Sequence, residues 1–239
     1  MIIDFILFFA LYSFIGWVLE TIFASALQRK FINRGFLIGP FTPIYGFSAI
    51  LIILLLVWIS ISEQNALITL IKNILLSTLM VTTLEFITGY LLEKIFHSKW
   101  WDYSDNFLNF KGYICFKYSI LWGVLAFALI QIVHPFMEQF IYLLPESTKM
   151  YIAIFFMVYF IFDSLVSAIG ALNLRKVIIH YSDLTLDKYK EKIIKYKRIF
   201  LAFPQLLILN ANVLKRDVRS ILNGRIDKVK DKNKFGFHD

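Results

Sequence analysis

"NRGFLIGPFTPIYG", residues 33–46, joins two long apolar runs and decides how the chain must fold. It contains three glycines and two prolines, although the whole chain of 239 residues has only 10 Gly and 5 Pro. Glycine permits close backbone approach and positive φ, whereas proline stops a helix. The segment therefore predicts a structured connector that ends one helix and begins the next.

A second interpretation makes residues 33–46 a short re-entrant or interfacial segment whose free backbone groups line a polar cavity. Irregular backbone is tolerated at membrane depth only where protein or water covers it. In that case Arg34 would give the cavity a fixed positive charge for an anionic group. Under both interpretations the candidate residues are Asn33, Arg34, Gly35, Gly39, Pro40, Pro43, Tyr45 and Gly46.

Composition places the chain in a membrane. It is 59% hydrophobic, 18% aromatic and 18% charged, with a mean hydropathy of +0.67, which lies outside the range of ordinary soluble domains. A spanning helix needs ~20 apolar residues, and five windows qualify: 3–26, 43–61, 73–95, 117–141 and 149–172. We therefore expect an all-α polytopic membrane protein with a transmembrane domain over 1–172 and a basic tail over 173–239.

The placement of Lys and Arg predicts the orientation, because these residues are retained on the cytoplasmic side of a membrane. With five spans, all of the 25 Lys and Arg residues except Lys72 and Lys149 fall on one side. We therefore expect a multi-pass protein of the bacterial cytoplasmic membrane, with its N-terminus outside and its C-terminus in the cytoplasm.

The tail over 173–239 carries the positive charge of the chain, since the remainder is close to neutral. Such a tail either binds anionic lipid headgroups or is merely a solvated face. After Pro204, apolar residues recur at helical spacing and predict an amphipathic helix that lies on the membrane or on the loops: Leu207, Ala211, Leu214, Val218 and Ile221. Nucleic acid is not an expected partner, because no recognition motif accompanies the charge.

The first and third windows contain similar segments, "FIGWVLETIF" (14–23) and "FITGYLLEKIF" (86–96). With Thr88 as a one-residue insertion, a glycine and a glutamate coincide, and Glu20 aligns with Glu93. The similarity predicts two parallel hairpins related by a pseudo-two-fold axis along the membrane normal. In transporters built this way, the substrate site lies at the repeat interface.

Four acids fall within the predicted spans: Glu20, Glu85, Glu93 and Asp163. An ionised side chain at the bilayer centre costs ~2.5–3.5 kcal/mol on insertion scales, so such residues are candidates for transport or coupling. For Glu20 and Glu93 an ion pair with a loop cation, such as Arg29 or Arg34, is an equal alternative.

The segment "HSKWWDYSDNFLNFKG" (97–112) is rich in aromatic and polar residues. Three of its rings fit the aromatic belt at the headgroup level: Trp100, Trp101 and Tyr103. Asp102 and Asp105 could bind a hard cation together with His97, but their spacing matches no metal motif. We therefore expect no metal, and we favour a contact surface for a cytoplasmic partner or a headgroup site.

Four segments together resemble a known bacterial family: "YSFIGWVLE" (12–20), "NRGFLIGPFTPIYGF" (33–47), "LLEKIFHSKWWDYSD" (91–105) and "LWG" (121–123). They are similar to the ABC-transporter type IV permeases, the CmpB-like integral membrane proteins. The resemblance covers roughly residues 8–135. It implies a transport subunit in the membrane, and it brings neither catalytic residues nor a substrate.

Three classes of function remain open. A transport subunit would work with membrane lipids around it, as a homo- or hetero-oligomer or with a separate ATPase chain, because no G-x-x-x-x-G-K-[ST] occurs in the sequence. An intramembrane enzyme or lipid-headgroup-handling protein would use Glu20, Glu93 and Asp102, but nucleophile and metal motifs are lacking, which favours a non-enzymatic role without cofactor. A scaffold or regulator would recruit partners through its tail. Neighbouring acids that face one cavity would favour the first two classes.

Overall fold

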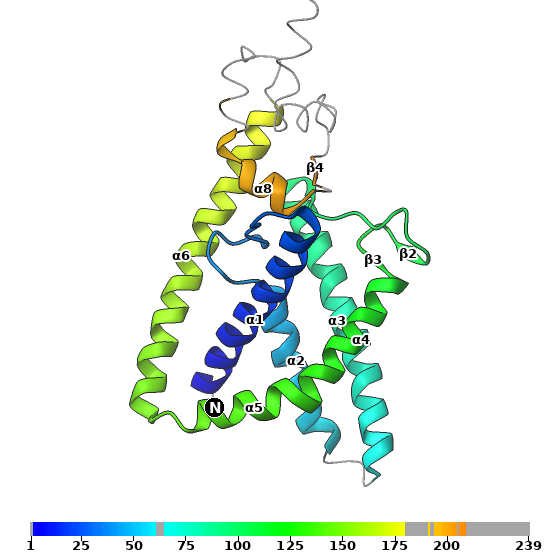
Figure 1. Ribbon diagram of the computed structural model, residues 1–239, viewed down its shortest axis with the longest axis vertical. Coiled ribbons are helices and arrows are strands. Elements are labelled where there is room, and N and C mark those ends of the chain that lie inside the picture. The colour runs from blue at the N-terminus through cyan, green and yellow to red at the C-terminus, as the bar shows by residue number, and fades with distance from the viewer. Residues whose placement is uncertain (1, 61–64, 180–190, 192–193, 205, 209–239) are drawn as a thin grey trace, which may run out of the picture.

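The computed structural model describes residues 2–60, 65–179, 191, 194–204 and 206–208, and within them the chain is an all-α polytopic membrane protein (Figure 1). Four of the described helices are long and apolar enough to cross a membrane. They are α1 (Ile2–Gln28), α3 (Ala66–Phe96), the continuous helix Phe116–Tyr142 and α6 (Glu146–Ile179).

The remaining apolar helix, α2 (Pro43–Ser60), corresponds to the predicted span 43–61 but is shorter than the other four. Its first turn lies beside the middle of α1 and not beside the end of that helix. The evidence is a hydrogen bond of 2.9 Å from the N–H of Thr42 to the carbonyl of Ser13. The segment before α2 is therefore irregular backbone over a depth of the bundle that a longer α2 would otherwise span.

The helix Phe116–Tyr142 is bent rather than straight. It consists of α4 (Phe116–Ala128), the single π-helical stretch η1 (Leu129–Val133) and α5 (His134–Tyr142). Pro135 is the second residue after the π-helical stretch, in the first turn of α5. Proline lacks an N–H and crowds the carbonyl one turn earlier, and a π-turn relieves that conflict. Figure 1 shows the result, with α5 running across the end of the bundle where α1 begins.

The helices pack in sequence order, α1 on α2, α2 on α3 and α3 on α4, while α6 returns to pack on α1 (Figure 1). Buried apolar side chains bind these helices at two levels. Leu7, Phe8 and Ile53 belong to a cluster shared by α1, α2, α5 and α6. Trp100 and Leu174 belong to a second cluster, which joins the end of α3 to α6 and to the short helix α8 (Lys197–Ala202).

Two small antiparallel pairings lie at the end of the bundle where α3 ends. Strand β1 (Ser98–Lys99) pairs with β4 (Leu207–Ile208), and β2 (Asn109–Phe110) pairs with β3 (Ile114–Cys115). The predicted amphipathic helix is therefore wrong at its first residue, because Leu207 lies in a strand that pairs with the chain just after α3. Its other predicted residues lie outside the part of the chain that the structure describes: Ala211, Leu214, Val218 and Ile221.

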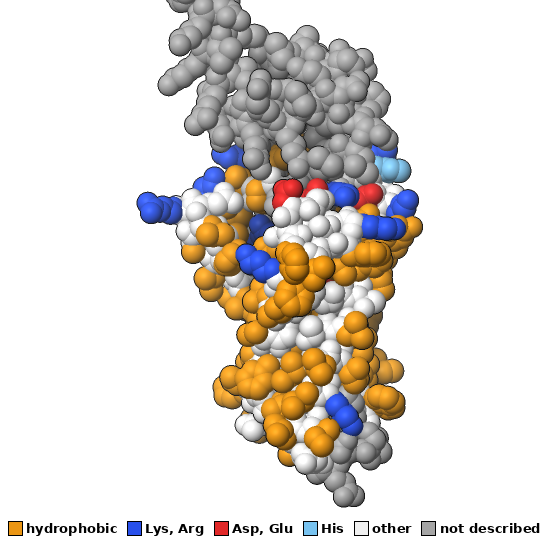
Figure 2. All heavy atoms as spheres, turned by 90° about the vertical axis from the view of Figure 1, so that its right-hand side faces the viewer, with side chains coloured by type: hydrophobic (Ala, Val, Ile, Leu, Met, Phe, Trp, Pro, Cys, Tyr) orange, Lys and Arg blue, Asp and Glu red, His pale blue; other side chains and the backbone are white. Residues whose placement is uncertain are grey.

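We call this end of the bundle, where α1 and α3 end and residues 97–115 lie, the basic end. Figure 2 shows hydrophobic side chains along the faces of the helices and most of the visible Lys and Arg side chains towards this end. Large apolar residues such as Leu75, Phe155 and Phe162 are exposed by more than half on the helix faces. A surface of this kind is suited to lipid.

Candidate functional site

The connector between α1 and α2, residues 29–42, runs down into the bundle instead of across its end. The N–H of Arg34 donates to the hydroxyl of Thr21 at 3.3 Å, and Thr42 reaches the carbonyl of Ser13. Thr21 and Ser13 stand eight residues apart on α1, or about 12 Å at helical rise. The connector therefore lies between α1 and α6 as irregular backbone inside the helical bundle (Figure 1).

An acid on α6 satisfies the connector's N–H groups. One carboxylate oxygen of Asp163 accepts the N–H of Ile38 and the other accepts the N–H of Gly39, both at 3.0 Å. The hydroxyls of Tyr159 and Ser167 also donate to this carboxylate, at 3.1 and 3.2 Å. Asp163 is buried, with 6% of its surface exposed. A charged acceptor thus replaces the water that these backbone donors would otherwise need.

A base on α8 satisfies the carbonyl groups of the same connector. The guanidinium of Arg198 donates to the carbonyls of Gly35, Phe36 and Leu37 at 3.2, 3.2 and 3.0 Å. Burial lowers the pKa of Arg198, and the negative charge of Asp163 opposes that change. The connector is therefore held between an anion that takes its N–H groups and a cation that takes its carbonyls.

The glycines of the connector have a packing reason. A Cβ at Gly39 would overlap the hydroxyl of Tyr159, and in the first turn of α2, just after the connector, one at Gly46 would overlap Ser13 and Phe9 of α1. Gly35 has φ +132°, a conformation that a side chain would strain. Close approach explains why scarce glycines are concentrated in this segment, and proline at the first position of α2 fits the start of a helix.

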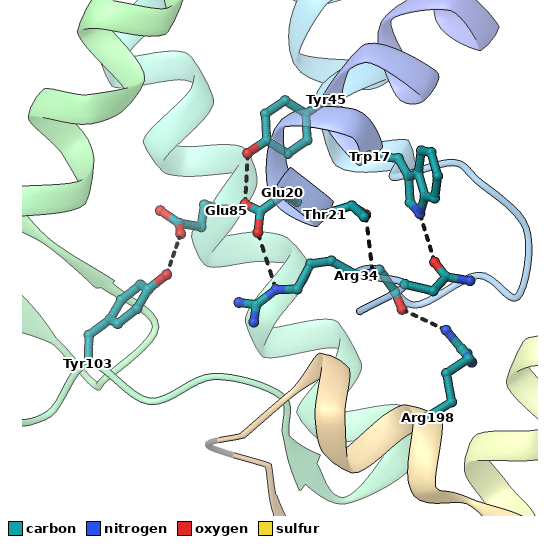
Figure 3. Close-up of polar contacts among 10 residues, drawn as sticks. Trp17, Glu20, Thr21, Arg34, Tyr45, Glu85, Tyr103 and Arg198 are labelled. Carbon is teal, nitrogen blue, oxygen red and sulfur yellow. Dashed lines mark hydrogen bonds and ion pairs between the residues drawn. The ribbon is translucent and has the colours of Figure 1, made fainter. Parts of the chain in front are cut away.

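Glu20 joins the end of α1 to both sides of the connector (Figure 3). One of its oxygens lies 3.2 Å from Nε of Arg34, and the other accepts the hydroxyl of Tyr45 at 2.8 Å. Nearby, the indole N–H of Trp17 donates to Asn33 at 2.7 Å, and Asn33 donates on to the carbonyl of Ile38 at 2.8 Å. The predicted ion pair of Glu20 with a loop arginine is thus present, and its partner is Arg34.

Glu85 on α3 is as buried as Asp163, with 5% of its surface exposed, but it has a different set of partners. The indole N–H of Trp122 donates to one oxygen at 2.9 Å, and the hydroxyl of Tyr103 donates to the other at 3.3 Å. Burial and the negative charge of Glu85 raise the pKa of Tyr103 well above its ordinary value, so this hydroxyl stays a donor. Both partners of Glu85 are uncharged.

Glu20 and Glu85 face one cavity of about 290 Å³ between the helix pairs α1–α2 and α3–α4. The cavity walls are largely aromatic, and they include Tyr45, Trp101 and Trp122. A second cavity of about 280 Å³, with apolar walls, shares Tyr45 and Trp122 with the first. The two ring centroids lie 5.3 Å apart. We call the first cavity the polar chamber and the second the apolar chamber.

The other predicted acids lie elsewhere. Glu93 accepts the hydroxyl of Tyr113 at 2.7 Å, and burial together with this bond raises the pKa of Tyr113 to about 12. Asp102 accepts the N–H of Ser104 at 3.1 Å, within a turn, and Asp105 is exposed. Of the three acids considered for an enzyme, only Glu20 lines the polar chamber. In the described residues no group of three His, Cys, Asp or Glu side chains is arranged to hold a metal.

The aromatic-belt interpretation is wrong for Trp100. Its ring is 5% exposed and packs between Phe36, Phe96 and Phe203, with centroids 4.9–5.9 Å apart. Trp101 and Tyr103 line the polar chamber instead. The rings of this segment that are exposed belong to Phe107 and Phe110.

Sequence reasoning missed three residues of the site. Trp122 was noted as part of a motif without a role, although its N–H binds Glu85. Arg198 binds the carbonyls of the connector, and the ring of Tyr159 packs on Phe41 of the connector while its hydroxyl donates to Asp163. Both residues are more than 100 positions away from the connector along the chain. A lone arginine in a basic tail and a tyrosine in an apolar span carry no local signal of such a contact.

Comparison with known proteins identifies one family. A family model described as "Putative ABC-transporter type IV" matches residues 7–168, more than half of the chain. No curated protein and no solved structure is significantly similar to the chain. The match includes the connector, the apolar chamber, Asp163 and all of the polar chamber except Phe203, whereas Arg198 lies beyond it.

Proposed function

Because the chain belongs to the family described as "Putative ABC-transporter type IV", we propose that it is a transport subunit whose substrate path runs through the polar and apolar chambers. Membership makes it an ABC-transporter-type membrane protein. The path, the partners and the orientation form the proposal.

One observation carries the proposal: two carboxylates from different helix pairs face the same cavity among apolar helices. An ionised group in a membrane span is costly and is retained where it serves a function or meets a partner. Glu20 is matched by Arg34, whereas the described partners of Glu85 are two neutral donors. A scaffold protein would not need a cavity whose wall carries a buried acid with only neutral partners.

The predicted repeat fits this arrangement, since transporter sites lie between repeats. Gly16 and Gly89 occupy equivalent positions in the two segments, and at each the added Cβ would meet an aromatic ring from further along the chain. At Gly16 this ring is that of Tyr45, and at Gly89 the rings are those of Tyr113 and Trp101. Each half would thus use its glycine to bring an aromatic ring against the glutamate-bearing helix.

The basic end is proposed to face the cytoplasm of a bacterial cell, with the N-terminus outside. Cysteine labelling tests this orientation in a Cys115→Ser background, because Cys115 is the single cysteine of the chain. Leu143 and Phe107 are 80% and 75% exposed. Leu143 directly follows α5 and Phe107 lies between β1 and β2, and these elements are at opposite ends of the bundle (Figure 1). A membrane-impermeant maleimide should label Leu143→Cys on intact cells and Phe107→Cys only after lysis. The reverse pattern would overturn the orientation.

A separate ATPase subunit is expected, because the chain has no phosphate-binding loop of its own. The test is affinity purification of the tagged protein from native membranes in mild detergent, with mass spectrometry of the proteins that copurify. We expect a nucleotide-binding chain in near-stoichiometric amount, absent when an unrelated tagged membrane protein is purified in the same way. Recovery of the protein alone, from membranes in which such chains are expressed, would overturn the ABC-type assembly.

A further inference from the structure

The net charge of the polar chamber indicates which kind of ligand it would bind. Arg34 supplies a positive charge, but its Nε lies 3.2 Å from a carboxylate oxygen of Glu20. This pair is neutral as a unit, so Arg34 does not supply the unpaired positive charge that the second interpretation of residues 33–46 required. The carboxylate of Glu85 remains, with a neutral donor on each oxygen. With Glu85 ionised, the chamber carries one net negative charge.

The walls of the polar chamber carry aromatic side chains. Tyr45, Trp101, Tyr103 and Trp122 all line it. The indole N–H of Trp101 is used by the carbonyl of Tyr113 at 2.8 Å, and that of Trp122 by Glu85. The N–H groups of both indoles are therefore engaged, so what these residues add to the chamber wall is aromatic surface. Aromatic faces around a negative charge attract organic cations, including quaternary ammonium groups.

The size of the apolar chamber limits the apolar part of the ligand. This chamber borders the polar chamber at Tyr45 and Trp122, which line both cavities and whose ring centroids lie 5.3 Å apart, so a ligand that fills both has to part these two rings. Its further walls include Leu19, Ile52, Val81 and Leu125. At about 280 Å³ it accommodates one short alkyl group, and it is too small for the two acyl chains of a phospholipid. A ligand that fills both chambers has a charged head and a single apolar substituent.

We propose that the two chambers together bind an organic cation, with its ammonium group between Glu85 and the aromatic rings of the polar chamber and its alkyl substituent in the apolar chamber. This names a substrate class for the transport subunit and rests on the proposed function only for the transport step. The ammonium group belongs either to a free amine or to a lipid headgroup, and these sources are separated below.

The experiment measures binding to the purified full chain in a neutral maltoside detergent by calorimetry, with empty micelles as the blank. The probes are tetramethylammonium, butyltrimethylammonium, hexyltrimethylammonium and octanoate. We expect the cations to bind with affinity rising about fourfold for each added methylene, and octanoate to bind at least tenfold more weakly than hexyltrimethylammonium. Tighter binding of octanoate would overturn the proposal, because it would mean that Arg34 governs the chamber.

Two substitutions separate the head site from the tail site. Glu85→Gln should weaken every cation at least tenfold, whereas the matched control Glu93→Gln, on the same helix but outside the chamber wall, should leave affinity unchanged. Ile52→Trp, which fills the apolar chamber, should leave tetramethylammonium binding within about twofold and remove the dependence on chain length. Equal affinity in Glu85→Gln and the parent protein would overturn the proposal. Melting curves of each variant confirm that the measurements are made on folded protein.

Hexylphosphocholine, a lipid analogue with a quaternary ammonium headgroup and a single chain, distinguishes the two sources. If it displaces hexyltrimethylammonium, the ammonium comes from a lipid headgroup, and if it does not, the ligand is a free amine. Cation binding without a copurifying ATPase would support this site and overturn the ABC-type assembly. An ATPase partner without cation binding would do the opposite.

Discussion

Glu85 and Asp163 are acids of nearly equal burial, 5% and 6% exposed, and each lies in a long apolar helix. Asp163 is bound by two backbone N–H groups, which cannot turn away. Glu85 is bound by the side chains of Trp122 and Tyr103 and borders a cavity. Burial in an apolar helix therefore does not distinguish an acid that anchors backbone from an acid that faces a ligand. The hydrogen-bond partners of the acid do distinguish the two. Each acid can be neutralised with little change of shape, which tests the contrast directly.

The largest effect is expected for Asp163→Asn. An amide presents an NH₂ group to one of the two backbone donors. The N–H of Ile38 also lies 3.1 Å from the hydroxyl oxygen of Ser167, whereas for the N–H of Gly39 the described acceptor is Asp163 alone. In either orientation the carboxylate charge is lost and an NH₂ group opposes a backbone N–H, so we expect a loss of about 3 kcal/mol in the free energy of unfolding. The measurement is thermal or denaturant unfolding of the purified protein in detergent. A loss below about 1 kcal/mol would contradict the anchoring role.

The next effect is expected for Gly39→Ala. The added Cβ would overlap the hydroxyl of Tyr159 and press on the carboxylate of Asp163, so we expect a loss of about 2 kcal/mol, in the range of overpacking.

Tyr159→Phe removes the obstructing hydroxyl. The double variant Gly39→Ala/Tyr159→Phe should therefore recover part of the loss, and the two changes should be non-additive by about 1 kcal/mol. Strict additivity would show that the glycine is required for another reason.

A smaller effect is expected for Arg198→Lys. The guanidinium serves three carbonyls in one fork, and an ammonium on a flexible stem cannot reproduce that geometry. We expect a loss of about 1.5 kcal/mol, since hydrogen bonds to charged groups contribute 1.5–3 each and Lys retains some of them. Exposed Lys197→Arg is the matched control on the same helix and should change the free energy of unfolding by no more than about 0.5 kcal/mol.

The class of fold was readable from the sequence, because apolar runs of sufficient length have few alternatives. The depth of the connector was not fixed by its glycines and prolines, since both interpretations of residues 33–46 use the same residue types. It depends on Asp163 and Arg198, which come from other helices. The sequence identifies Glu85 and Asp163 alike as candidate intramembrane acids, and only their hydrogen-bond partners in the structure distinguish their roles. Partners of this kind are set by tertiary packing, which leaves no periodic trace in the sequence.

The smallest effect on stability is expected for Glu85→Gln. The new amide can turn its NH₂ towards Tyr103, whose hydroxyl rotates to accept it, while the carbonyl keeps the N–H of Trp122. The hydroxyl hydrogen of Tyr103 loses Glu85 as its acceptor, but Tyr103 lines the polar chamber and this hydrogen can turn into it. The free energy of unfolding should therefore change by less than about 1 kcal/mol, measured as for Asp163→Asn. A loss of about 3 kcal/mol would make Glu85 an anchor like Asp163. A stable Glu85→Gln protein that no longer binds a cation would instead separate the two acids by role, because the same loss of charge would then affect stability at one site and recognition at the other.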